Sequence, residues 1–207
     1  SVIEVSSTGL SIKAYDPLSS DITDNQSVQN PKDYETTFSH NNPSSDKLVD
    51  DKGINPEDVN QGQLGDCYFL SSVASLAQLD PKKIHGGEDS IIQGPNKDGT
   101  YTVKLYIPDE NNNPTRVSIA VDPSFLTKKV KKKSDNMGLT DKSTVLAQPS
   151  KNKEMWPQLL EKALAQLEGS YKEVEGGKKN MNLRGIQFLT GEKVAYHQLS
   201  KGLESPI

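Results

Sequence analysis

The amino-acid sequence predicts an α+β fold that is mainly helical and contains one β-hairpin. Two segments, beginning at Cys67 and near Trp156, carry apolar residues at helical spacing. Between them, residues 101–107 and 117–121 alternate apolar and polar side chains, as half-buried strands do. With 207 residues, 32% of them hydrophobic, and a formal net charge of −4, the chain suits one polar domain or one and a half.

Residues 1–49 are expected to form a polar leader of poor order, or an extended strap. They are rich in Ser, Asp, Asn and Pro, and their apolar residues are too sparse to make a core alone. Short pieces such as residues 12–15 can lie against the body. Residues 50–58 follow as an acidic, turn-rich approach. Carboxylates around a glycine fit either a solvated turn or a calcium site, because calcium takes hard oxygen ligands.

The only cysteine opens the first predicted helix. That helix is expected to begin near Leu64 and to end at Asp80, because Pro81 disfavours helical geometry in the residue before it. A thiol in the first turn lies at the positive end of the helix dipole, which favours the thiolate that attacks carbonyl carbon. Six residues before Cys67, the amide of Gln61 can fold back and, with the backbone N–H of Cys67, stabilise a tetrahedral oxyanion. The alternative is that the cysteine is a buried core residue without chemistry, as lone cysteines on apolar helices usually are.

The remaining elements follow from turn and cap residues. A polar turn at residues 109–114 joins the two alternating segments, which predicts the β-hairpin. Residues 122–153 are polar and rich in lysine without a clear period, and a long surface excursion is expected there. In the second helix, Pro157 suits the first turn and Gly169 suits the C-terminal cap. Trp156 is expected to anchor the core rather than to serve a site.

Composition excludes several classes of function. The sequence has no run of about 18 apolar residues, so no membrane span is expected, and residues 1–30 lack the pattern of a signal peptide. The compartment stays open between cytoplasmic and secreted. A single cysteine excludes an internal disulfide framework and zinc sites with several cysteines. A mildly acidic chain has no general attraction to nucleic acid, and its lysine cluster at residues 128–133 is expected to be a solvated loop.

Two sequence blocks resemble calpain-type cysteine proteases. Residues 60–70, Asn-Gln-Gly-Gln-Leu-Gly-Asp-Cys-Tyr-Phe-Leu, are similar to the active-site signature of that family, including the interval from Gln61 to Cys67. Tyr68 stands where the family usually has tryptophan. Residues 156–163, Trp-Pro-Gln-Leu-Leu-Glu-Lys-Ala, resemble a helix near the end of the first half of the calpain protease core. The resemblance implies a papain-like fold, with residues 50–191 as the first, nucleophile-bearing subdomain and residues 192–207 as the start of a second one.

The implied activity is limited endoproteolysis of polypeptides through a thioester acyl-enzyme. A thiol protease also needs a histidine as base and an Asn to orient it. In calpains both lie in blocks of the second half that do not occur here, so a second subdomain is the expected partner and the chain alone is expected to be inactive. His40 and His85 are poorly placed, and His197, 130 residues after Cys67, lacks a following Asn or Asp. The alternatives are a non-catalytic binding or regulatory module and, with no feature that selects it, a transferase or deamidase.

The resemblance also implies a calcium site and no organic cofactor. In conventional calpains, the first half of the core binds calcium through backbone carbonyls and two carboxylates. The carboxylate positions correspond to Asp58 and Glu154, and the backbone positions correspond to Asp51 and Gly53. Such an ion would tie the loop before Gln61 to the start of the second helix and bring the oxyanion donor into register with Cys67.

Overall fold

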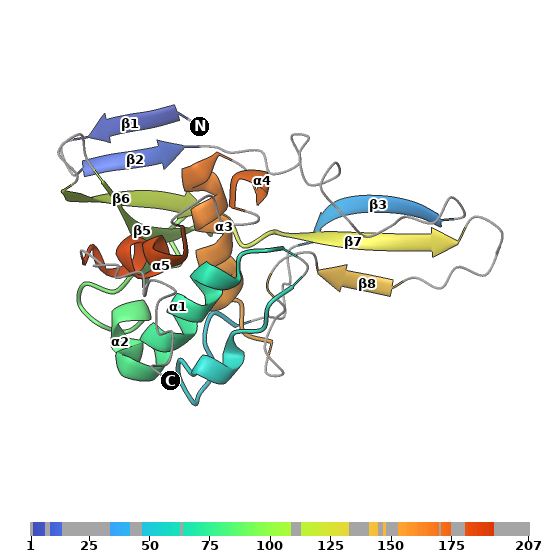
Figure 1. Ribbon diagram of the computed structural model, residues 1–207, viewed down its shortest axis with the longest axis horizontal. Helices are drawn as coiled ribbons and strands as arrows, with labels where there is room; N and C mark the ends of the chain where they lie inside the picture. Colours follow the sequence, from blue (N-terminus) through green and yellow to red (C-terminus); the bar gives the residue numbers. More distant parts are fainter. Residues whose placement is uncertain are drawn as a thin grey trace, which may run out of the picture.

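The computed structural model describes residues 2–6, 9–13, 34–41, 47–62, 64–108, 113–132, 141–144, 147, 153–169, 171–174 and 181–192. It has a body in which helices pack against a sheet, and an arm of three strands that extends away from the body (Figure 1). The mixture of helix and sheet confirms the predicted α+β class. The expectation of a mainly helical fold is wrong, because the described residues form two separate sheets.

The sheet of the body has five strands in the order β1-β2-β6-β5-β4. These are β1 (Val2–Ser6), β2 (Gly9–Lys13), β4 (Ile92–Gln93), β5 (Tyr101–Pro108) and β6 (Pro114–Val121). The predicted hairpin is confirmed, since β5 and β6 pair antiparallel from Tyr101 opposite Val121 to Pro108 opposite Pro114. Its alternation has the expected cause: Val103, Leu105, Val117 and Ile119 are buried.

Strands from the predicted leader complete both sheets. β2 pairs parallel with β6, with Ile12 opposite Ile119, and β1 pairs antiparallel with β2. β3 (Tyr34–Asn41) belongs to the arm. The pairing of β2 with β6 joins segments about 100 residues apart in the sequence, so no local pattern in residues 1–49 reveals it. The boundaries predicted at residues 49 and 191 stay a prediction.

The arm contains β3, β7 (Phe125–Lys132) and β8 (Asp141–Thr144) in the order β3-β7-β8, all antiparallel (Figure 1). The predicted excursion at residues 122–153 therefore includes these two strands, and the lysines at residues 128–132 lie in β7 rather than in the predicted loop. β7 pairs with β3 along its whole length, from Tyr34 opposite Lys132 to Asn41 opposite Phe125. The backbone N–H and C=O groups of β7 therefore bond to β3 and β8. A strand held in this way does not need the alternation of apolar and polar residues that a core strand shows.

The helices of the body are α1 (Cys67–Leu79), α2 (Pro81–Ile84), α3 (Trp156–Glu168), α4 (Tyr171–Val174) and α5 (Met181–Thr190), with a 3-10 turn, η1 (Pro56–Asp58). The predicted end of the first helix is confirmed, because Asp80 is the C-terminal cap of α1. The prediction for the ends of the second helix is also confirmed. Pro157 lies in the first turn of α3, and Gly169 ends the helix in the left-handed conformation, with φ of 98°.

Helix α3 lies at the centre of the body, where it packs against α1, α4, β5 and β6. Its side chains from Trp156 to Gln166 are all buried, on every face of the helix. The predicted core anchor is confirmed, since Trp156 is 0% exposed. Because the helix is covered all round, its polar residues Glu161 and Lys162 are buried as well. A helix that sequence reading takes to be amphipathic is therefore a core element.

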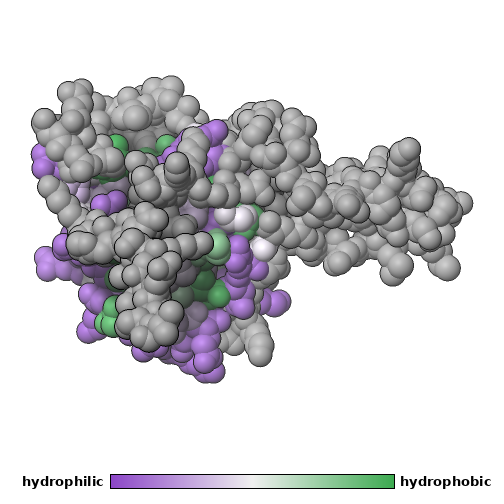
Figure 2. All heavy atoms as spheres, viewed as in Figure 1, coloured by the Kyte–Doolittle hydropathy of each residue, from purple (hydrophilic) through white to green (hydrophobic). Residues whose placement is uncertain are grey.

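Helix α1, which carries the cysteine, is held closely by α5. At Gly185 of α5 an added Cβ would lie 2.3 Å from Oγ of Ser72 and 2.7 Å from the carbonyl oxygen of Tyr68, both on α1. Only a glycine permits this approach. In the described part of the chain, no helix has the length and apolar character to cross a membrane. The described residues on the face shown in Figure 2 are mostly hydrophilic, with scattered hydrophobic ones.

Candidate active site

Cys67 is the first residue of α1, and its side chain is exposed. The three residues after it, Tyr68, Phe69 and Leu70, are buried and fix the first turn of the helix in the body. The backbone N–H groups of Phe69 and Leu70 both donate to the carbonyl of Asp66, at 2.8 and 3.2 Å, so the helix begins at this point. The thiol is therefore presented at the N-terminal end of a firmly anchored helix, where N–H groups point outward.

Gln61 lies in the loop before this helix and is exposed. Its Nε2 donates to the carbonyl oxygen of Leu64 at 2.9 Å, which ties the side chain to the turn that leads into Cys67. An amide nitrogen carries two hydrogens, and among the described residues the second one has no acceptor. The arrangement holds the amide of Gln61 beside the turn that leads to Cys67.

None of the three histidines has a described side chain near Cys67. The ring of His85 is bonded through Nδ1 to the carbonyl of Ile92 at 3.1 Å and follows the far end of α1. A helix rises about 1.5 Å per residue, so the end of α1, which His85 follows, lies roughly 18 Å along the helix from Cys67. His40 lies in β3 of the arm, where only the backbone is described, and His197 lies outside the described residues.

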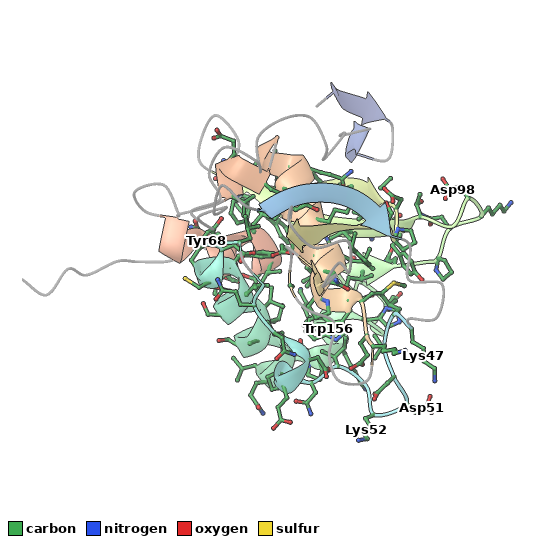
Figure 3. All side chains as sticks on the ribbon, turned by 90° about the vertical axis from the view of Figure 1, so that its right-hand side faces the viewer. Lys47, Asp51, Lys52, Tyr68, Asp98 and Trp156 are labelled. Atoms are coloured by element: carbon green, nitrogen blue, oxygen red, sulfur yellow. The ribbon has the colours of Figure 1, made fainter. Side chains whose placement is uncertain are left out.

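The turn at residues 50–53 contains two of the predicted calcium ligands. The side chain of Asp51 is 99% exposed and forms an ion pair with Nζ of Lys47 at 3.7 Å. Gly53 has φ of 81°, and its N–H donates to the carbonyl of Asp50 at 3.2 Å, which closes the turn. Asp51 and Lys52 lie at the outer edge of this turn (Figure 3). The turn therefore fixes the backbone of Asp51, while its carboxylate is exposed to solvent.

The two carboxylates predicted as calcium ligands are both buried. Glu154 is 0% exposed, and its Oε1 accepts the N–H of Asp50 at 2.8 Å, so it is held against the 50–53 turn. A short parallel bridge between Lys47 and Glu154 strengthens this contact. Asp58 serves as a cap instead, because its Oδ2 accepts the N–H of Asn55 at 2.9 Å. Among the described residues, no three His, Cys, Asp or Glu side chains gather in a way that could hold a metal.

Behind Cys67 the structure reveals a carboxyl pair that sequence reasoning missed. Asp66 and Glu161 of α3 are each 0% exposed, and neither oxygen of Asp66 nor Oε1 of Glu161 has a hydrogen-bond partner among the described residues. Burial raises the pKa of Asp66 to about 6, against an opposing effect of Glu161. Burial, with the charge of Asp66, raises the pKa of Glu161 well above its usual range. The only signal in the sequence was an acidic residue beside the cysteine and another in an apolar helix.

A buried lysine was missed in the same way. Nζ of Lys162 donates to Oδ2 of Asp122 at 2.9 Å, to the carbonyl of Asp122 at 3.1 Å and to the carbonyl of Ser124 at 2.6 Å. Burial lowers the pKa of Lys162, and the bond to Asp122 opposes that effect. Burial alone would raise the pKa of Asp122, but bonds from Ser124 and Lys162 bring it below its usual value. This lysine ties α3 to the segment between β6 and the arm.

Comparison with known proteins supports the reading of the two sequence blocks. The model of the calpain family of cysteine proteases matches residues 14–205. The chain is 34% identical over 151 residues to the calpain-type cysteine protease ADL1 of Oryza sativa subsp. japonica, which covers 73% of this chain and 6% of that protein. It is 36% identical over 141 residues to the calpain-type cysteine protease DEK1 of Zea mays, which covers 68% of this chain and 6% of that protein.

The animal calpains are more distant. The chain is 28% identical over 151 residues to the catalytic subunit of human calpain-1, covering 72% of this chain and 18% of that protein. It thus spans only a small share of each relative's length. The family match nevertheless extends over nearly all of the chain and includes both the cysteine turn and the Trp156 helix. The chain belongs to the calpain family of cysteine proteases.

Proposed function

We propose that this chain is the nucleophile-bearing half of a papain-like cysteine endopeptidase of the calpain type. Cys67 is its nucleophile, and the side-chain amide of Gln61 and the backbone N–H of Cys67 are its oxyanion donors. A following segment, the second subdomain, supplies the histidine and the Asn. The observation that carries this proposal is the exposed thiol at the first residue of a helix whose next three residues are buried.

The chemistry assigned to these groups is acyl transfer. The thiolate of Cys67 attacks the carbonyl carbon of a peptide bond, and the carbonyl oxygen becomes an oxyanion that the two N–H donors stabilise. The C–N bond then breaks, the histidine gives its proton to the leaving amine, and a thioester remains. Water, activated by the same histidine, hydrolyses the thioester and regenerates the thiol. Among the described side chains, none near Cys67 is a histidine that could act as the base of the first step.

Gln61 is well suited to its part, because one N–H of its amide is bound to Leu64 and holds the group in place. Preorganised donors of this kind contribute about 10²–10³ in rate each. Gln61→Ala is therefore expected to lower kcat by about 10²-fold, since the remaining backbone donor is unchanged. Gln61→Glu, which cannot donate, is expected to show a loss of the same order at neutral pH.

The first test is labelling of Cys67 in this chain with a thiol-directed epoxide, beside Cys67→Ala and free cysteine. Because Cys67 is the sole cysteine, all labelling reports on it. A rate above that of free cysteine supports an activated nucleophile. The second test joins the chain to the second half of the core and measures cleavage of an unfolded protein substrate. Cleavage that is lost in Cys67→Ala supports the protease, and no cleavage with the histidine and Asn present supports a non-catalytic binding module.

Calcium is the ion that we propose for this half. The donor set has the right chemistry, namely carboxylate oxygens of Asp58 and Glu154 and backbone carbonyls of Asp51 and Gly53. The bond from Asp50 to Glu154 already holds one carboxylate beside the turn that carries the carbonyls. The carboxylate of Asp58, however, has to be shared with the N–H of Asn55.

A readout independent of activity tests the calcium proposal. A ligand present at one hundred times its Kd stabilises the folded chain by about 2.7 kcal/mol. Calcium is expected to raise the melting temperature of the wild type above its value in chelator, and magnesium is expected to have a smaller effect. Glu154→Gln keeps the acceptor for Asp50 but removes the charge, so the calcium effect should disappear. The control Glu57→Gln removes an exposed carboxylate of the same region and should retain it.

A further inference from the structure

The three-stranded arm carries a charge opposite to that of the chain as a whole. Its strands β3, β7 and β8 contain five lysines and two acidic residues, whereas the complete chain has a formal net charge of −4. The arm extends away from the body, and among the described elements its strands pack mainly on one another (Figure 1). Positive charge is therefore concentrated on a projection from an otherwise acidic chain.

The strand register brings three of these lysines together. Residues directly opposite each other in an antiparallel pair share a face of the sheet, and successive residues of a strand alternate between the faces. Lys129 lies opposite Lys142 of β8, and Lys131 comes two positions after Lys129 in β7. All three thus lie on one face of the arm, named here the Lys129 face. Glu35 of β3, opposite Lys131, is the acidic residue that the described strands place on it.

This arrangement does not serve the stability of the arm. Like charges directly opposite each other destabilise a strand pair, and Lys129 and Lys142 form such a pair. On its other side Lys129 lies opposite Thr37, which brings no compensating charge. Lysines often protect edge strands from pairing with other chains. That role does not account for these lysines, because β7 is the central strand of the arm and carries four of the five. An anionic ligand accounts for them better.

The start of the arm is fixed to the body. Phe125, the first residue of β7, is 1% exposed and belongs to the core. Just before it, Nζ of Lys162 donates to the carbonyl of Asp122 at 3.1 Å and to that of Ser124 at 2.6 Å. The buried start of β7 therefore sets where the Lys129 face begins relative to α3.

We propose that the Lys129 face is a docking surface for an extended, acidic segment of a polypeptide. The choice of a polypeptide rests on the proposed function, which makes polypeptides the substrates of this chain. Side chains on one side of an extended segment repeat roughly every 6.6 Å, so acidic residues at every second position match the spacing of Lys129 and Lys131 along β7.

The other residues of the Lys129 face favour this ligand over other polyanions. Beyond the buried Phe125, the described strands place only Lys, Glu, Thr, Ser and Asn on this face. Without an aromatic residue the face lacks the stacking platform of single-stranded nucleic-acid sites. Without an apolar residue it has nothing to bury in the interface of a lipid bilayer. Hydroxyl and amide groups beside lysines suit the carboxylates and backbone of a peptide.

The test measures binding of a fluorescent peptide to the whole chain by anisotropy. The probe alternates Glu and Thr, and a peptide that alternates Gln and Thr is the control for charge. The variant Lys129→Gln/Lys142→Gln changes the Lys129 face. The matched variant Lys128→Gln/Lys132→Gln removes the same charge from the opposite face of the same arm. Should a double variant fold poorly, Lys142→Gln and Lys132→Gln provide the same comparison.

The wild type is expected to bind the Glu–Thr peptide and not the Gln–Thr peptide, with an affinity that falls as salt screens the charges. Lys129→Gln/Lys142→Gln should raise the Kd about tenfold, and Lys128→Gln/Lys132→Gln should raise it less than about threefold. In circular dichroism melting, Lys129→Gln/Lys142→Gln should be no less stable than the wild type, because its like-charged pair is gone.

Equal losses of affinity in the two double variants would overturn the proposal, since a general attraction for anions does not depend on the face. Absence of binding would overturn it as well. So would tighter binding of the wild type, at the same salt, to phosphatidylserine vesicles or to an oligothymidylate, because the ligand would then be a lipid surface or a nucleic acid. Peptide binding does not need the thiol. If Cys67 reacts no faster than free cysteine, the proposed protease fails, and the peptide affinities still decide whether the face binds.

Discussion

Replacement of Lys162 by methionine should destabilise the fold strongly, although the residue lies outside the candidate site. Methionine keeps the length and the apolar stem of the side chain, so the change removes the ammonium group and little packing. That group is buried, with 2% of the side chain exposed, and three oxygens of residues 122 and 124 lie within 3.1 Å of it. The variant leaves the carbonyls of Asp122 and Ser124 without this donor.

The magnitude follows from these contacts. An unsatisfied buried polar group costs about 1–3 kcal/mol, and since the two carbonyls are only partly buried, each is expected to contribute about 1–1.5 kcal/mol. The carboxylate of Asp122 is 54% exposed and can turn to water, so its loss adds little. The sum is a destabilisation of about 3 kcal/mol, at the lower end of the range of about 3–5 kcal/mol for breaking a buried pair. For a chain of this size, that corresponds to a fall in melting temperature on the order of 10 °C.

Circular dichroism melting of the whole chain measures this effect. Lys104→Met is the matched control, because Nζ of Lys104 lies 3.6 Å from an exposed carboxylate of Asp89 and the pair is screened by water. The control should melt close to the wild type. If Lys162→Met also melts within about 2 °C of the wild type, the contacts of its ammonium group do not hold α3 to the 122–124 segment, and the reasoning is refuted.

Three further predictions concern the supports of the site. Gly185→Ala should destabilise the chain by about 1–3 kcal/mol despite the better helix propensity of alanine, because the added Cβ would meet Ser72 and Tyr68. Adding Ser72→Gly should restore part of this loss in urea unfolding. A double variant no more stable than Gly185→Ala would refute the contact between the two helices. Gly53→Ala should lower the free energy of unfolding by about 1 kcal/mol, because the φ of 81° is unfavourable for alanine and nothing lies within 4 Å of the added Cβ. An unchanged free energy of unfolding in urea would contradict this prediction. The fold lowers the pKa of Asp122, so its pair with Lys162 stabilises the folded state above the ordinary carboxyl pKa of 3.8, and this stabilisation is lost as pH falls below that value. The difference in unfolding free energy between wild type and Lys162→Met should therefore become smaller at low pH. A difference that does not change with pH would contradict the pair.

Elements built from local contacts could be predicted from the sequence. The stripe after Cys67, the cap residues of α3 and the alternation of β5 and β6 each reflect a pattern within one segment. The parallel pairing of β2 with β6 and the pairing of β3 with β7 could not be predicted, because each joins residues far apart in the sequence, such as Ile12 with Ile119 and Tyr34 with Lys132. The lysine-rich segment was read as a loop for this reason.

The exposed Cys67 and the anchored Gln61 agree with the positions that the sequence suggested for them, while their chemical roles stay predictions. What could not be predicted is the support beneath them. An apolar stripe on α3 leaves Glu161 and Lys162 on the opposite face, which sequence reading assigns to solvent. The fold covers that face too, and burial of a charge cannot be inferred from periodicity when a helix is enclosed on all sides.

Three charged residues on α3 and the segment before it reach three different parts of the body. Glu154 accepts the N–H of Asp50 in the turn before the Gln61 loop, Glu161 accepts the N–H of Ala147, and Lys162 binds the segment that leads to the arm. Each contact is buried on the α3 side and directional, so each fixes a segment that has few apolar residues of its own.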